Sequence, residues 1–130
     1  MSSNHYSPAN KKIYLPILLA FALGAAVFVG LQSARPSKYD DFAKCLTEKG
    51  ATFYGAFWCP HCQNQKKIFG SAKKYLNYVE CSTADGNGQL PTCNKAGIES
   101  YPTWDFGNEI RITGELSLSA LAEQTNCQLP

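Results

Sequence analysis

Two cysteines with two residues between them could form a redox-active pair in this chain. They belong to the pentapeptide WCPHC at residues 58–62. The run 51–57 before it is short and aromatic, as expected of a buried strand, and the run 63–75 after it predicts a helix. A cysteine at a helix start faces free backbone N–H groups and the positive end of the helix dipole, which favour the nucleophilic thiolate. This order of elements predicts dithiol–disulfide chemistry.

Each residue of the pentapeptide can be given a role. We expect Cys59, at the helix start, to be the attacking thiolate and Cys62, one turn further in, to be the resolving thiol. Pro60 suits the first helical turn, where no hydrogen-bond donor is lost. His61, when protonated, would stabilise the reduced thiolate form and raise the reduction potential, although it could also be a bystander. Trp58 is expected to shield the disulfide and to pack beside it.

The remaining elements predict an α/β domain. In chain order they are a helix over 39–49, strands over 51–57 and 77–82 on either side of the helix over 63–75, a helical turn over 92–96, strands over 101–106 and 109–113, and a last helix capped by Ser117. A parallel crossover joined to an antiparallel hairpin gives a mixed four-stranded sheet flanked by helices. In such a sheet, the cysteine pair and Tyr101-Pro102 could meet at one end.

The N-terminal part of the chain predicts a membrane anchor. Residues 13–31 carry no charge and would span about 28 Å as a helix, close to the hydrocarbon thickness of a bilayer. Lys11 and Lys12 precede them, so the positive-inside rule keeps residues 1–12 in the cytoplasm. Residues 32–38 would then link this transmembrane signal-anchor to the exported domain at 39–130. A cleaved signal peptide with a weak cleavage site is the alternative.

Composition agrees with an exported domain. Six cysteines in 130 residues favour an oxidising compartment, and a net charge of +2 gives no support for nucleic-acid binding. We therefore expect a single-pass protein of the cytoplasmic membrane, with its domain on the extracytoplasmic side.

Residues from about 39 to 127 resemble the thioredoxin fold. The resemblance is to the thioredoxin-like domain associated with bacterial and plant homologues of vitamin K epoxide reductase. Three segments carry it, namely YGAFWCPHC at 54–62, YVEC at 78–81 and YPTW at 101–104. The resemblance implies a dithiol oxidoreductase in which Pro102 is cis and packs beside the cysteine pair, while Trp58, Tyr101 and Pro102 hold an extended substrate segment. It also implies that a quinone-linked membrane partner recycles the protein.

The resemblance also indicates the direction of disulfide exchange, and this chain differs from the family in two ways. Cys-Pro-His-Cys is similar to the motif of strongly oxidising bacterial disulfide oxidases, so we expect disulfide donation to exported protein dithiols rather than reduction or isomerisation. One transmembrane segment cannot form a four-helix quinone site, so the vitamin K epoxide reductase-like partner would be a separate protein. Thioredoxins carry a buried acid six residues before the first motif cysteine, where this chain has Phe53. Proton transfer at Cys62 would then use water, Glu80 or another group.

The other four cysteines are expected to form structural disulfides. Cys81 and Cys93 align with a cysteine pair of the resembling family, which leaves Cys45 and Cys127 to tie the ends of the domain together. From the sequence, three pairings of these four remain open. A second redox pair that relays electrons is the alternative role.

Two other functions are compatible with parts of the sequence. Cys59, His61 and Cys62 could bind Cu(I), but Met1 is the sole methionine and His5 lies before the apolar stretch. A redox-inert interaction domain is disfavoured because the cysteine pair and the Tyr-Pro element are intact. We expect no metal ion and no organic cofactor, since the Cys59–Cys62 disulfide itself carries the electrons.

Overall fold

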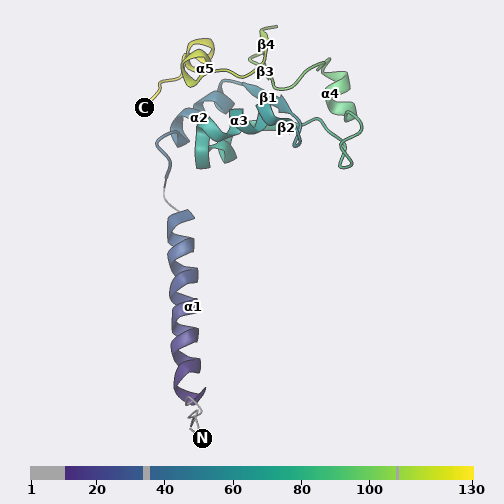
Figure 1. Ribbon diagram of the computed structural model, residues 1–130. Coiled ribbons are helices and arrows are strands. Elements are labelled where there is room, and N and C mark those ends of the chain that lie inside the picture. Colours follow the sequence, from purple (N-terminus) through teal and green to yellow (C-terminus); the bar gives the residue numbers. More distant parts are fainter. Residues whose placement is uncertain (1–10, 34–35, 108) are drawn as a thin grey trace, which may run out of the picture. The chain divides into compact units, whose positions relative to one another are not determined.

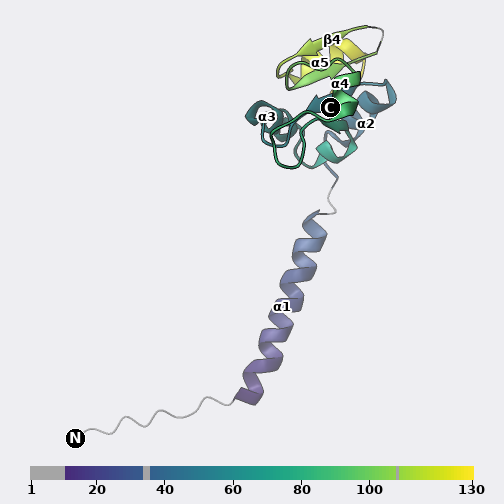
Figure 2. The ribbon, with the colours of Figure 1, turned by 90° about the vertical axis from the view of Figure 1, so that its right-hand side faces the viewer.

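The computed structural model of this protein describes residues 11–33, 36–107 and 109–130. They fall into two compact units that divide after residue 35. The first unit is helix α1 (Lys11–Ser33), which continues without interruption through Pro16 (Figures 1 and 2).

The predicted membrane anchor at 13–31 stays a prediction. Within the ranges that the structure describes, no helix is long and apolar enough to cross a membrane. Some side chains of the predicted span 13–31 lie outside the described residues. The same is true of residues 1–10 of the predicted cytoplasmic segment and of residues 34 and 35 of the predicted linker.

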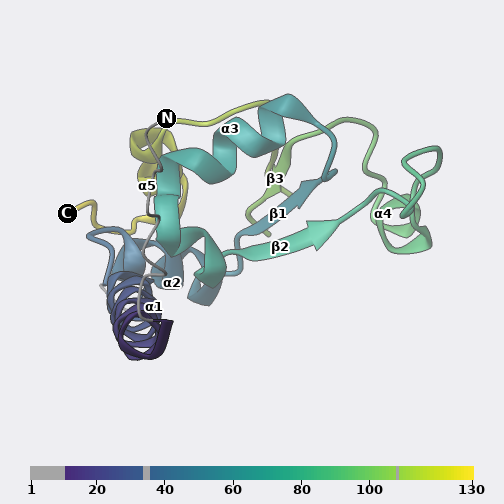
Figure 3. The same cartoon turned by 60° about the horizontal axis from the view of Figure 1, so that its bottom comes forward.

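The second unit contains a mixed four-stranded sheet, as predicted. Its strands are β1 (Thr52–Gly55), β2 (Asn77–Glu80), β3 (Thr103–Asp105) and β4 (Arg111–Thr113), in the spatial order β2-β1-β3-β4. β1 pairs in parallel with β2 and antiparallel with β3, and β3 pairs antiparallel with β4. Figure 3 shows that β1 and β2 point the same way. Helix α3, which lies between these two strands in the sequence, runs back alongside the sheet.

Five helical elements surround this sheet. They are α2 (Asp40–Glu48), α3 (Pro60–Phe69), the 3₁₀ helix η1 (Gly70–Tyr75), α4 (Pro91–Lys95) and α5 (Leu118–Thr125). The hydroxyl of Ser117 accepts a hydrogen bond from the Ala120 N–H at 3.1 Å, which confirms the predicted cap of the last helix.

Element boundaries differ from the prediction around Gly70. The predicted helix over 63–75 begins earlier, at Pro60, and its second half is a 3₁₀ helix. Gly70 has a φ of +57°, which ends α3 at a conformation that other residues rarely adopt. The strands are also shorter than predicted, and residue 108 of the predicted hairpin turn lies outside the described residues.

Aromatic rings form the core on one face of the sheet. The ring of Phe53 on β1 stacks on Trp104 of β3, with centroids 4.8 Å apart. Phe69 of α3 packs against Trp104 and stacks on Phe42 of α2. Because side chains alternate along a strand, Tyr54 points to the opposite face, where a smaller cluster with α4 covers the sheet. The C-terminal end of α3 is therefore fixed against β3 and α2.

Both expected structural disulfides are present. Cys45 of α2 is bonded to Cys127 after α5, and Cys81 after β2 is bonded to Cys93 of α4. The first bridge joins residues 82 apart in the sequence and the second joins residues 12 apart. In the chain-entropy account, the longer loop restricts the unfolded chain more strongly.

Replacing Cys45 and Cys127 together by alanine should lower the free energy of unfolding by about 4.5 kcal/mol, because an unfolded loop of this length is no longer closed. The Cys81→Ala/Cys93→Ala double variant is the matched control, with an expected loss of about 3 kcal/mol. Urea unfolding of the full chain, followed by the fluorescence of Trp58 and Trp104, measures both. Equal urea midpoints for the first variant and the parent would contradict the stapling role.

Candidate active site

Cys59 lies where β1 gives way to α3. It is the N-cap residue of α3, and Pro60 occupies the first helical turn as expected. The Cys59 N–H donates to the Ala56 carbonyl and the Cys59 carbonyl accepts from Gln63, both at 3.1 Å. These bonds fix the Cys59 backbone at the start of α3, where free N–H groups and the positive end of the helix dipole lie.

Cys62 lies one turn further in and is fully buried. Both Cys59 and Cys62 are free thiols here. Burial raises the pKa of the Cys62 thiol to about 12; the Cys59 side chain also raises it, whereas a backbone hydrogen bond at Ala56 opposes the shift. A Cβ atom at Gly55 would come within 2.9 Å of the Cys62 sulfur, so the site requires glycine there.

The structure brings the Tyr101-Pro102 element to the cysteine pair. The Tyr101–Pro102 peptide bond is cis, and Pro102 is buried. The thiol of Cys59 donates to the Tyr101 carbonyl at 3.8 Å, although the two residues are 42 positions apart. The predicted meeting of these two elements at one end of the sheet is therefore confirmed.

Trp58 lies beside the pair with half of its surface exposed. Its indole N–H donates to the Ser82 hydroxyl at 2.7 Å, and its ring meets Tyr101 edge-on with centroids 6.1 Å apart. A Cβ at Gly86 would lie 3.5 Å from the Trp58 ring, so the loop after β2 also contacts it. Phe57 is exposed next to Trp58, which leaves an aromatic surface beside Cys59.

His61 points away from the core and pairs with a residue that the sequence analysis missed. Its Nδ1 lies 2.6 Å from the Glu115 carboxylate, which also accepts a hydrogen bond from Asn64 at 3.4 Å. Glu115 precedes α5 and is 54 positions from His61, so no local spacing could have identified it.

A second polar group lies on β2, behind Cys62. The carboxylate of Glu80 accepts hydrogen bonds from the backbone N–H groups of Phe57 and Ser82, at 3.2 and 2.9 Å, and from the Tyr78 hydroxyl at 2.7 Å. Burial and the bond to Glu80 raise the pKa of Tyr78. The ammonium of Lys66 lies 3.3 Å from the centroid of the Tyr78 ring, and burial lowers its pKa. Sequence analysis had named Glu80 alone of these groups.

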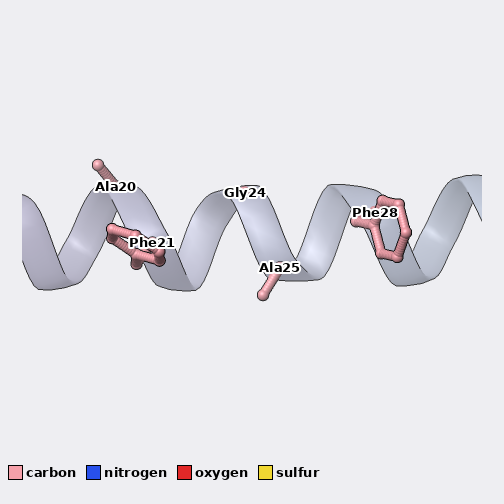
Figure 4. A pocket seen from close by; sticks show the side chains of 5 residues that line it. All are labelled: Ala20, Phe21, Gly24, Ala25 and Phe28. Atoms are coloured by element: carbon pink, nitrogen blue, oxygen red, sulfur yellow. The ribbon is translucent and has the colours of Figure 1, made fainter.

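The described residues offer no cluster for a metal. Within them, no group of three or more His, Cys, Asp and Glu side chains could hold a metal ion. The hollow in Figure 4 is lined by residues of α1 alone, namely Ala20, Phe21, Gly24, Ala25 and Phe28. None of these side chains can act as an acid, a base or a nucleophile, so the dithiol chemistry belongs to the second unit.

Comparison with known proteins supports an enzyme of thiol–disulfide exchange. No family model matches the chain. The chain is 46% identical over 91 residues to the thiol-disulfide oxidoreductase LTO1 of Arabidopsis thaliana. The match covers 67% of this chain and 24% of that relative, so the chain spans about a quarter of the relative's length.

Iodoacetamide should modify Cys59 of the reduced protein well before Cys62 at any pH up to about 9. Cys62 is fully buried and its raised pKa keeps it a thiol below about pH 12, and only a thiolate is alkylated quickly. Peptide mapping by mass spectrometry after timed quenching measures both sites, and the Cys59→Ala variant is the control for direct attack on Cys62. Equal labelling of the two cysteines at pH 7 would contradict the assigned roles.

Proposed function

We propose that this chain is a thiol–disulfide oxidoreductase of thioredoxin-like architecture that works through Cys59 and Cys62. The observation that carries the proposal is the contact between the Cys59 thiol and the Tyr101 carbonyl, with Cys62 buried behind it. It places one sulfur at a helix start beside an element that can receive a substrate, and the other within reach for resolution. The similarity to a thiol-disulfide oxidoreductase supports the same activity.

The exchange proceeds through a mixed disulfide. A substrate thiolate attacks the Cys59 sulfur of the oxidised pair, the Cys59–Cys62 bond breaks, and Cys62 leaves and takes up a proton. A second substrate thiolate then attacks the substrate sulfur, and Cys59 leaves as a thiolate stabilised by the α3 N-terminus. The substrate loses two electrons and gains a disulfide, while the pair becomes a dithiol.

We favour the direction in which the protein donates disulfides. Everything that stabilises the Cys59 thiolate stabilises the reduced pair, and so makes the disulfide a stronger oxidant. The α3 N-terminus does so directly. His61 adds to it when it is protonated, and Glu115 holds that imidazole at the edge of the site. The alternative is an exported reductase or isomerase, which would use the same geometry with a lower reduction potential.

The surface beside Cys59 indicates the kind of substrate, and the N-terminal sequence indicates where in the cell the protein works. The substrate is a dithiol in an extended segment that lies against Trp58, Tyr101 and Pro102. The uncharged run 13–31 after Lys11 and Lys12 would anchor the protein in the cytoplasmic membrane with its domain outside, where the substrates are exported proteins. A separate quinone-linked protein similar to vitamin K epoxide reductase would reoxidise the pair. Two disulfides in so small a unit support an oxidising compartment.

The oxidised full chain should convert a peptide dithiol to its disulfide, one peptide per protein molecule. The Cys62→Ala variant, charged at Cys59 with a small disulfide, should accumulate a mixed disulfide with a single-cysteine version of the peptide, because neither partner then has a second thiol to resolve it. The Cys59→Ala variant should accumulate none, since Cys62 is buried. Mass spectrometry after acid quenching identifies each species. Peptide oxidation that persists in the Cys59→Ala variant would contradict the proposal.

A further inference from the structure

Cys62 needs a proton acceptor that its own position does not supply. Phe53, six residues before Cys59, is apolar and stacks on Trp104, so β1 offers no acid there. Burial raises the pKa of Cys62 to about 12, which leaves almost no thiolate at neutral pH. When Cys62 attacks a mixed disulfide at Cys59, its proton must therefore pass to a nearby group.

The absent side chain of Gly55 lets Cys62 and the Tyr78 ring of β2 approach the same point of β1. The point where a Gly55 Cβ would lie is 2.9 Å from the Cys62 sulfur and 3.1 Å from Cε2 of Tyr78. The sulfur and the phenol ring thus both lie close to Gly55. Cε2 is bonded to the ring carbon that carries the Tyr78 hydroxyl, and this hydroxyl donates to the Glu80 carboxylate at 2.7 Å. The Tyr78 side chain therefore links the neighbourhood of the thiol to an acid on the adjacent strand.

We propose that Glu80 accepts the proton of Cys62, relayed by the Tyr78 hydroxyl, as Cys62 resolves a mixed disulfide at Cys59. This inference rests on the proposed function. The Cys62–Cys59 sulfur bond forms, the bond from Cys59 to the substrate sulfur breaks, and the substrate thiolate leaves with the electron pair. The Cys62 proton ends on Glu80. In disulfide donation the same path returns a proton to Cys62 as it leaves.

Lys66 supports this transfer from α3. Its ammonium lies over the Tyr78 ring and is close enough to both Glu80 and Cys62 to attract a negative charge on either of them. It also borders a hollow of about 290 Å³ with Tyr78 and Lys73, which is large enough to admit water beside the path. The titratable groups that face Cys62 or this path are Cys59 and Lys66 on α3, Lys73 on η1, Tyr78 and Glu80 on β2, and Tyr101 before β3.

Glu80 also has a structural role that the test must separate from proton transfer. Its carboxylate holds the backbone N–H of Phe57, just before the motif, and that of Ser82, whose hydroxyl binds Trp58. The Glu80→Gln variant keeps an oxygen for both N–H groups and loses the base. The Tyr78→Phe variant keeps the ring beneath Lys66 and loses the relay. Glu48→Gln, on the exposed end of α2, is the matched control.

The experiment follows one turnover of the full chain, with the Cys59–Cys62 pair reduced, after mixing with oxidised glutathione. Cys59 attack gives a glutathione mixed disulfide, and Cys62 attack then releases glutathione, so acid quenching and mass spectrometry time the two steps separately. In Glu80→Gln and Tyr78→Phe the second step should slow by about tenfold or more at pH 6–7, since general acid–base catalysis contributes at least that much. The first step should be unchanged, and the defect should shrink towards pH 9 as hydroxide replaces the carboxylate.

Resolution at the parent rate in both variants would overturn the inference. A slowing of equal size at every pH would also overturn it, because a displaced loop rather than a lost base gives that result. If the parent chain itself forms no mixed disulfide at Cys59, the proposed function fails. Tryptophan fluorescence of each variant reports whether the second unit remains folded.

Discussion

The chemistry of this protein depends on the contact between the Cys59 sulfur and the Tyr101 carbonyl. Forty-two residues separate the two groups, and the antiparallel pairing of β1 with β3 brings them together. Phe53 and Trp104 form one register pair in that ladder and also stack, so the core of the domain fixes the same two strands that carry the site. A change that loosens this stack would therefore move the substrate side of the site away from the nucleophile.

The two sulfurs differ because α3 places them in different surroundings. Cys59 is the N-cap of α3, buried beside the Tyr101 carbonyl, whereas Cys62 lies one turn further into the core against Gly55 and Tyr78. The first position faces the free N–H groups of a helix start, and burial in the second favours a thiol that ionises only when it reacts. This asymmetry explains how identical side chains can serve as attacking and resolving groups, and why the second needs a proton path.

Sequence analysis predicted the features that are set by local pattern. The cysteine pair, the mixed sheet and the Ser117 cap all follow from short-range signals. The Cys81–Cys93 bridge and the cis bond at Pro102 follow from the family resemblance, and Cys45–Cys127 was expected as the remaining pair. The contacts of Glu115 and Tyr78 could not be predicted, because they depend on how distant segments pack. The change to a 3₁₀ helix at Gly70 was missed, because a glycine inside a helical pattern is often tolerated.

The reduction potential of Cys59–Cys62 tests the central claim most directly. Equilibration of the full chain against glutathione buffers, with thiol trapping at each ratio, gives this value for the pair alone. Donation of disulfides from a thiolate-stabilising site predicts a potential of about −120 to −180 mV, in the range of known oxidants and isomerases. A potential near about −270 mV or lower, as in thioredoxins, would contradict disulfide donation and assign the site to reduction.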